Sequence, residues 1–104
     1  MNALLEEIGI NELTVEQLQK LCEIGEQAAK AYIHSIVPER RILTLDITVD
    51  TEGNKPVTVN VEVEISLSPL MKNFNADGLA KKATEKAFEA INKYLRELSC
   101  KSTK

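Results

Sequence analysis

The stretch LTLDITVDTEGNKPVTVNVEVEISLS, residues 43–68, decides the fold that the sequence predicts. Apolar and polar side chains alternate strictly along residues 43–50 and again along residues 57–68. Because successive side chains of a strand point to opposite faces, this period of two predicts two strands, each with one apolar and one polar face. Gly53 and Asn54 supply the backbone freedom that a tight connection needs. The stretch therefore predicts an antiparallel β-hairpin.

A long amphipathic helix is predicted before the hairpin. Thr14 and Gln17 form a capping-box pattern, and apolar residues then recur at spacings of three and four as far as Ile36. Pro38 ends the pattern, because its ring cannot continue a helix. The middle of the apolar stripe is built from small residues, which allow another helix or a sheet to approach closely. These small residues are Gly25, Ala28 and Ala29.

A second long helix is predicted after the hairpin, with Asn75 or Asp77 as its N-cap. Its apolar line comprises Ala80, Ala83, Ala87, Ile91, Tyr94 and Leu98. The polar tail, residues 99–104, is expected to fray. At the other terminus, residues 1–12 are expected to form a short helix or an arm.

Together these segments predict an α+β fold in the order (α)-α-β-β-α, with a two-stranded antiparallel hairpin packed on one face by two long helices. The chain has 104 residues, 43% of them hydrophobic and 28% charged, which is typical of a globular protein. We expect residues 1–104 to form a single domain. No apolar run approaches the roughly 18 residues that a transmembrane helix needs, and the acidic N-terminus is not that of a secretory signal.

Residues that could perform chemistry are few. The chain has one histidine, His34, and two cysteines, Cys22 and Cys100, without a CxxC or HxxxH spacing. A zinc site needs about four ligands, so we expect no metal, and we find no nucleophile motif or phosphate-binding loop. We therefore expect no catalysis and no cofactor. Two isolated thiols favour a cytoplasmic protein, although a Cys22–Cys100 disulfide remains an alternative.

A two-stranded hairpin leaves both of its outer edges unpaired. The second strand extends over about twelve residues, is rich in valine and has no inward-pointing charge. We therefore expect the sheet to be extended by dimerisation with an identical or related chain, through a strand edge, a helix face or both. The candidate interface residues are Val61, Val63, Ile65, Leu67, Phe88, Ile91, Tyr94 and Leu95. The alternative is that the end of the first strand or the loop at residues 71–75 covers the edge.

Positive charge is concentrated at the C-terminal end of the chain. Residues 69–104 contain eight bases and four acids, whereas the whole chain has a formal net charge of -3. A basic helix face could contact nucleic-acid phosphates or an acidic partner, or simply face water. The candidate RNA-contacting residues are Lys81, Lys82, Lys86, Lys93 and Arg96. The alternative function is thus a small nucleic-acid-binding module.

The order of elements resembles that of a known family. It is carried by TVEQLQKLCEIGEQAAKAYIHSIVPERRILTLDITVD, then KPVTVNVEVEISLSP, then NADGLAKKATEKAFEAINKYLREL. Residues 13–98 resemble a small archaeal family of uncharacterised proteins, which looks like a paralogue of the small dimerising subunit of KEOPS, the tRNA threonylcarbamoyladenosine complex. The resemblance implies a non-catalytic subunit that pairs with the dimerising subunit and helps to hold the catalytic subunit and tRNA. The acidic first helix departs from what a tRNA-contacting surface needs, which leaves the last helix as the candidate.

Overall fold

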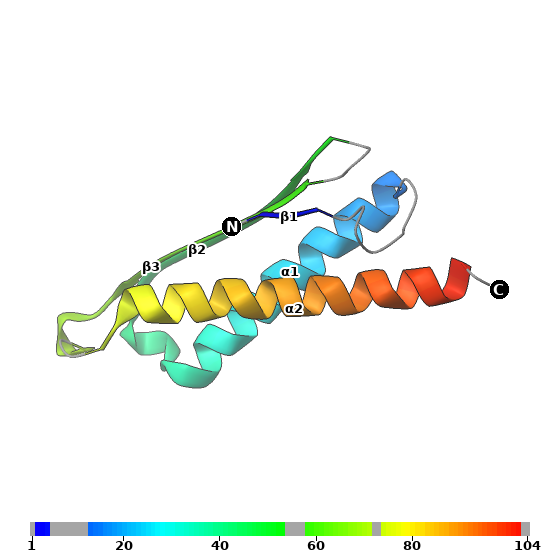
Figure 1. Cartoon of the computed structure of the whole chain (residues 1–104). Coiled ribbons are helices and arrows are strands. Elements are labelled where there is room, and N and C mark those ends of the chain that lie inside the picture. Colours follow the sequence, from blue (N-terminus) through cyan, green and yellow to red (C-terminus); the bar gives the residue numbers. More distant parts are fainter. Residues whose placement is uncertain (1, 5–12, 54–57, 72–73, 103–104) are drawn as a thin grey trace.

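The computed structural model describes residues 2–4, 13–53, 58–71 and 74–102 (Figure 1). It confirms the predicted α+β fold, with two helices and an antiparallel hairpin in the order α-β-β-α. Along the chain the elements are β1 (Asn2–Leu4), α1 (Val15–Ile36), the 3-10 turn η2 (Glu39–Arg41), β2 (Ile42–Glu52), β3 (Thr58–Leu67), the 3-10 turn η3 (Pro69–Met71) and α2 (Ala76–Ser102).

The hairpin has the predicted alternation of buried and exposed side chains. Ile47 lies opposite Val63 and Thr48 opposite Glu62, so the apolar side chains of both strands share one face. The exception is Leu43, which was predicted on the apolar face but is 62% exposed. A register shift between Ile42 and Thr44 explains this, because the additional residue of a bulge turns the side chains around it away from the regular alternation.

The N-terminal residues form a strand, so the expected short helix is wrong for residues 2–4. Strand β1 pairs antiparallel with β3, with Ala3 opposite Val59, and the sheet has the order β1-β3-β2. An isolated short helix is marginal in water, whereas the edge of β3 offers ready backbone partners. The rest of the expected N-terminal helix or arm, residues 5–12, lies outside the described residues.

Three of the four ends of the long helices lie where the sequence predicts them. The exception is the C-terminal end of α2. The Oγ1 of Thr14 accepts a hydrogen bond from the Gln17 N–H at 3.1 Å, and the Gln17 side chain accepts one from the Thr14 N–H at 2.9 Å. Of the two candidate caps of α2, the structure uses Asn75, whose Oδ1 accepts from the Gly78 N–H at 3.0 Å. At the C-terminus α2 continues to Ser102, into the tail that the sequence analysis expects to fray; the fraying stays a prediction, and residues 103–104 lie outside the described residues.

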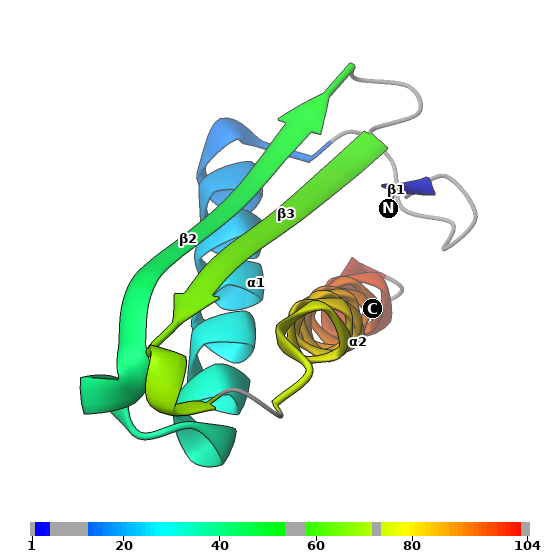
Figure 2. The same ribbon diagram turned by 90° about the vertical axis from the view of Figure 1, so that its left-hand side faces the viewer.

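The core lies between the helices and one face of the hairpin. The two helices pack mainly against each other, and on the sheet α1 packs against β2 and α2 against β3. Figure 2 shows α1 behind the hairpin and α2 to the side of β3. At the centre, a Cβ placed on Gly25 would lie 2.8 Å from the Cδ1 of Ile91 and 3.4 Å from the Cγ1 of Val49. The small middle of α1 therefore permits the close contact that its sequence predicted.

Candidate protein-interaction site

The outer edge of β2 is the longest unpaired strand edge in the described part of the chain. Among the described strands, which have the order β1-β3-β2, the eleven-residue strand β2 has only β3 as a neighbour. Figure 2 shows no described element beside the other edge of β2. Because alternate N–H and C=O groups of an edge strand point away from its neighbour, this edge is a template for a further strand.

The sequence analysis expected both outer edges of the hairpin to be unpaired and singled out that of the second strand. Strand β1 pairs with Thr58–Asn60 at the start of β3, whereas no described strand pairs with residues 61–67 on the same side. Helix α2 packs against β3 as well. The unpaired edge of β3 is therefore shorter than expected, because residues 2–4 supply a strand that their helical spacing did not predict. In the described part of the chain, the outer edge of β2 has no strand beside it along its whole length.

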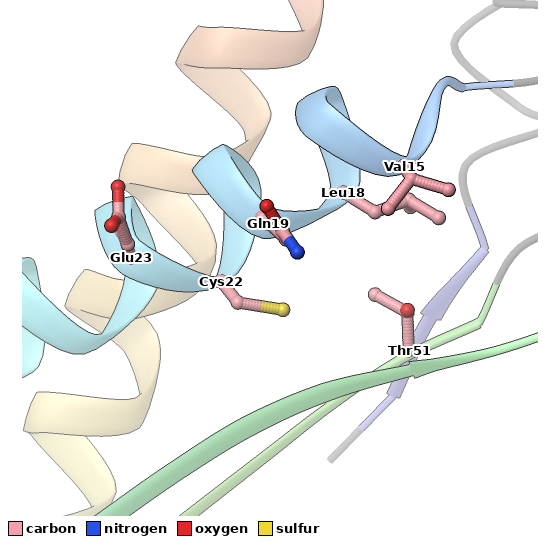
Figure 3. A pocket seen from close by; sticks show the side chains of 6 residues that line it. All are labelled: Val15, Leu18, Gln19, Cys22, Glu23 and Thr51. Carbon is pink, nitrogen blue, oxygen red and sulfur yellow. The ribbon is translucent and has the colours of Figure 1, made fainter.

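An apolar groove runs between α1 and β2. Its volume is about 410 Å³, and its lining residues are Val15, Leu18, Gln19, Cys22, Glu23 and Thr51. Figure 3 shows the side chains of Val15, Leu18 and Cys22 directed from α1 toward Thr51 on β2. Val15 is 70% exposed. On the helical wheel these α1 residues lie on the flank opposite Ala28 and Ala31, which line a groove shared with α2. The groove therefore lies on the open, β2 side of the molecule.

The thiol of Cys22 lies in this groove but is not activated. Burial, followed by the negative charges of Asp50 and Glu26, raises its pKa above the usual value of 9.0. The thiolate is the reactive form of cysteine, so a raised pKa keeps this side chain in its unreactive, protonated form at neutral pH. Cys22 thus acts as a small apolar residue of the groove.

The outer face of the sheet is acidic. Asp46 lies directly opposite Glu64, and Thr48 opposite Glu62. Asp50 lies opposite Asn60, whose Nδ2 donates a hydrogen bond to the Asp50 Oδ1 at 3.1 Å. Like charges directly opposite each other destabilise a strand pair. Asp46, Glu62 and Glu64 are exposed, so this face presents charge to the solvent. Among the described residues no group of histidine, cysteine or acidic side chains is arranged to hold a metal ion.

The apolar residues predicted to form a partner interface lie largely inside the chain's own core. Ile91 and Leu95 are fully buried and Val61 is 3% exposed. The other five are half-buried against the same core: Val63, Ile65, Leu67, Phe88 and Tyr94. The physical reason is that both long helices use their apolar stripes on the single apolar face of the hairpin. In the described part of the chain, the backbone edges without a strand neighbour are the outer edge of β2 and residues 61–67 of β3, and the groove lies beside β2.

The five candidate RNA-contacting residues, Lys81, Lys82, Lys86, Lys93 and Arg96, are all exposed on α2. The spacing of the last four places them on one stripe of the helix, whereas Lys81 is turned about 100° away. Glu89 lies on the same stripe, and its Oε2 is 3.4 Å from the Nζ of Lys86. The stripe is on the α2 side of the molecule, away from the open edge of β2.

In the stretches that the structure describes, no helix is both long and apolar enough to span a membrane. The fold defines a class of small α+β proteins in which two long helices cover one face of an antiparallel hairpin. Within that class, residues 10–94 match the family model described as "Protein of unknown function (DUF3194)". The chain belongs to this family of uncharacterised archaeal proteins.

Relatives and solved structures agree with this assignment. An uncharacterised protein from Thermococcus kodakarensis is 36% identical over 94 residues, covering 88% of this chain and 84% of the relative. One from Pyrococcus furiosus is 31% identical over 92 residues, covering 88% and 82%. A crystal structure from Thermococcus onnurineus NA1 has a TM-score of 0.76 over 88% of each chain, at 22% identity. The solution structure of a hypothetical protein from Methanothermobacter thermautotrophicus has a TM-score of 0.69 over 83% of this chain and 92% of that chain, also at 22% identity.

Proposed function

We propose that this protein is a non-catalytic assembly subunit that associates with a partner by adding a strand to the outer edge of β2. One observation carries the proposal: the edge is long and lightly protected. Between Thr44 and Thr51 it has no proline, no lysine and no inward-pointing charge, and its charged side chains are Asp46 and Asp50 on the solvent-facing side. Natural proteins usually protect such an edge with one of these devices. The bulge between Ile42 and Thr44 affects only the start of the strand.

The finer proposal is that the assembly is a cytoplasmic, KEOPS-like tRNA-modification complex. Its support is the resemblance of residues 13–98 to a paralogue of the small dimerising subunit, together with the open strand edge. Association through β2 would leave the basic stripe of α2 free on the other side of the molecule. In such a complex this protein would hold other subunits in place, and the chemistry would belong to a different chain.

The association is tested by light scattering after size exclusion, combined with amide hydrogen exchange measured residue by residue. In an unpaired edge strand, alternate N–H groups face water and exchange quickly, whereas in an extended sheet both sets are protected. We expect a mass above that of one chain and continuous protection along residues 44–51. A monomer with alternating protection along β2 at all accessible concentrations would refute the proposal. Mixing with the small KEOPS subunit tests the finer proposal, which predicts a hetero-dimer.

The alternative function, RNA binding, is favoured by the four basic side chains on one stripe of α2. It predicts that tRNA affinity falls steeply with salt, since each phosphate contact releases counterions. Lys82→Glu and Lys93→Glu should weaken binding, while Lys81→Glu, on a different side of the helix, serves as the matched control. If the isolated chain fails to bind tRNA at low salt, RNA binding by this chain alone is excluded.

A further inference from the structure

The outer edge of β2 is complementary to itself in one register. Ile47 is the midpoint of the strand Ile42–Glu52. If two copies of β2 pair antiparallel with Ile47 opposite Ile47, Thr44–Asp50 of one strand lie opposite the same residues of the other, and the irregular start of the strand stays at the two ends of the overlap. A register centred on Thr48 would pair the regular residues Thr44–Glu52, so the length of the overlap alone does not choose between the two registers.

The charges of β2 favour the same register. With the centre at Ile47, Asp46 lies opposite Thr48 of the second copy and Asp50 lies opposite its Thr44. With the centre at Thr48, Asp46 would lie opposite Asp50, and with the centre at Asp46, that carboxylate would face its own copy. Like charges placed directly opposite each other are destabilising. Of these three registers, the one centred on Ile47 is therefore the one that keeps the acids of the two strands from facing each other.

The apolar face of the sheet continues across this junction. Residues directly opposite each other point to the same side of a sheet, and the register places Leu45 opposite Val49. The helices of both copies therefore cover the same face of one continuous sheet. A shift by a single residue would instead place an apolar side chain beside a carboxylate. The groove containing Val15 and Cys22 lies beside Thr51, near one end of this junction.

We infer that the partner at the β2 edge is a second copy of this chain, paired antiparallel about a two-fold axis at Ile47. The inference rests on the proposed function, which it deepens by naming the partner and the register. It predicts an isologous dimer, in which the same surface of both copies forms the interface.

Cross-linking between two differently tagged copies tests the register. Both copies carry Cys22→Ala and Cys100→Ser, one also carries Asp46→Cys, and the other carries Thr48→Cys. Directly opposite residues have Cβ atoms close enough for a disulfide with slight adjustment, so we expect oxidation to link this pair about tenfold faster than the control pair. The control mixes Asp46→Cys with Asp50→Cys, which face each other only in the register centred on Thr48.

The outcomes separate the two proposals. Faster linkage of Asp46→Cys to Thr48→Cys supports the inferred dimer. Equal or faster linkage of the control pair overturns the register. A dimeric mass and continuous protection of β2 without any linkage of the first pair also overturns the register but leaves association through β2 standing. A monomer whose β2 amides exchange alternately overturns both.

Discussion

The two flanks of α1 differ in how much of their apolar surface the chain buries by itself. On the flank toward α2, Gly25 contacts Ile91 closely, and Ile91 is fully buried. On the flank toward β2, Val15 is 70% exposed beside an open groove. Burial of apolar surface is the main favourable contribution to folding. The comparison therefore teaches that the closed flank stabilises the fold, whereas the open flank keeps apolar surface available for a partner.

The largest expected effect is on the closed flank. Ile91→Ala should lower the free energy of unfolding by about 2–5 kcal/mol, because it removes buried methylene groups and leaves a cavity beside Gly25. Urea denaturation monitored by circular dichroism measures the change. Leu43→Ala is the matched control, since Leu43 is 62% exposed and its truncation should change stability by no more than about 0.5 kcal/mol. Equal losses in the two variants would break the distinction between the flanks.

A double-mutant cycle sharpens the comparison at the closest contact. Gly25→Ala adds a methyl group 2.8 Å from the Cδ1 of Ile91. The resulting steric clash offsets the stability gained from the higher helix propensity of alanine. Ile91→Val removes that carbon, so the double variant should be more stable than the sum of the single changes predicts. We expect a coupling of about 1 kcal/mol in urea unfolding.

Its control combines Ile91→Val with Lys30→Ala, an exposed position on α1. The free-energy changes of these two substitutions should add to within about 0.5 kcal/mol. If the free-energy changes of Gly25→Ala and Ile91→Val added as closely as those of the control pair, the close contact would not determine how α1 and α2 pack.

Substitutions of two neighbouring residues at the start of α1 distinguish an effect on stability from an effect on association. Thr14→Ala removes the capping hydrogen bond to the Gln17 N–H and should cost about 1 kcal/mol of stability. Val15→Ala should cost no more than about 0.5 kcal/mol, because that side chain is largely exposed. If a partner covers the groove, the second substitution should instead raise the dissociation constant measured by sedimentation. A large loss of stability in Val15→Ala would show that the open flank belongs to the folding core.

The helices and the hairpin could be predicted from the sequence because their signals are local. The capping box at Thr14 and the period of two along residues 57–68 each involve neighbouring residues. The partial cover of the β3 edge could not be predicted in this way, because β1 pairs with residues more than fifty positions along the chain. The outward turn of Leu43 depends on a bulge, which the alternation of residues does not reveal. Likewise, the spacing of Ile91 marks an apolar stripe but does not indicate that the chain's own sheet will cover it.

The smallest expected effect concerns the Cys22 thiol in the open groove. Because its pKa is raised in the folded state, it ionises there at higher pH than in the unfolded chain, whose thiol follows the usual value of 9.0. The stabilisation due to the protonated thiol is therefore complete below pH 9.0 and is lost as the pH rises through the folded pKa. Comparison of unfolding curves for the native chain and Cys22→Ala isolates this dependence from that of other groups.

The same thiol reports separately on its charged neighbour and on a partner. With Cys100→Ser as background, Asp50→Asn should speed alkylation of Cys22, because it removes one of the negative charges that raise the pKa of the thiol. Burial is the larger cause of the raised pKa and remains in the variant, so the increase in the alkylation rate should be modest.

If association covers the groove, alkylation of Cys22 should also slow as protein concentration rises. Because Asp50→Asn acts through charge and association acts through access, only the association effect should depend on concentration. An alkylation rate that is independent of concentration across the range where the chain dimerises would show that the groove stays open, and that the partner contacts the edge of β2 without covering α1.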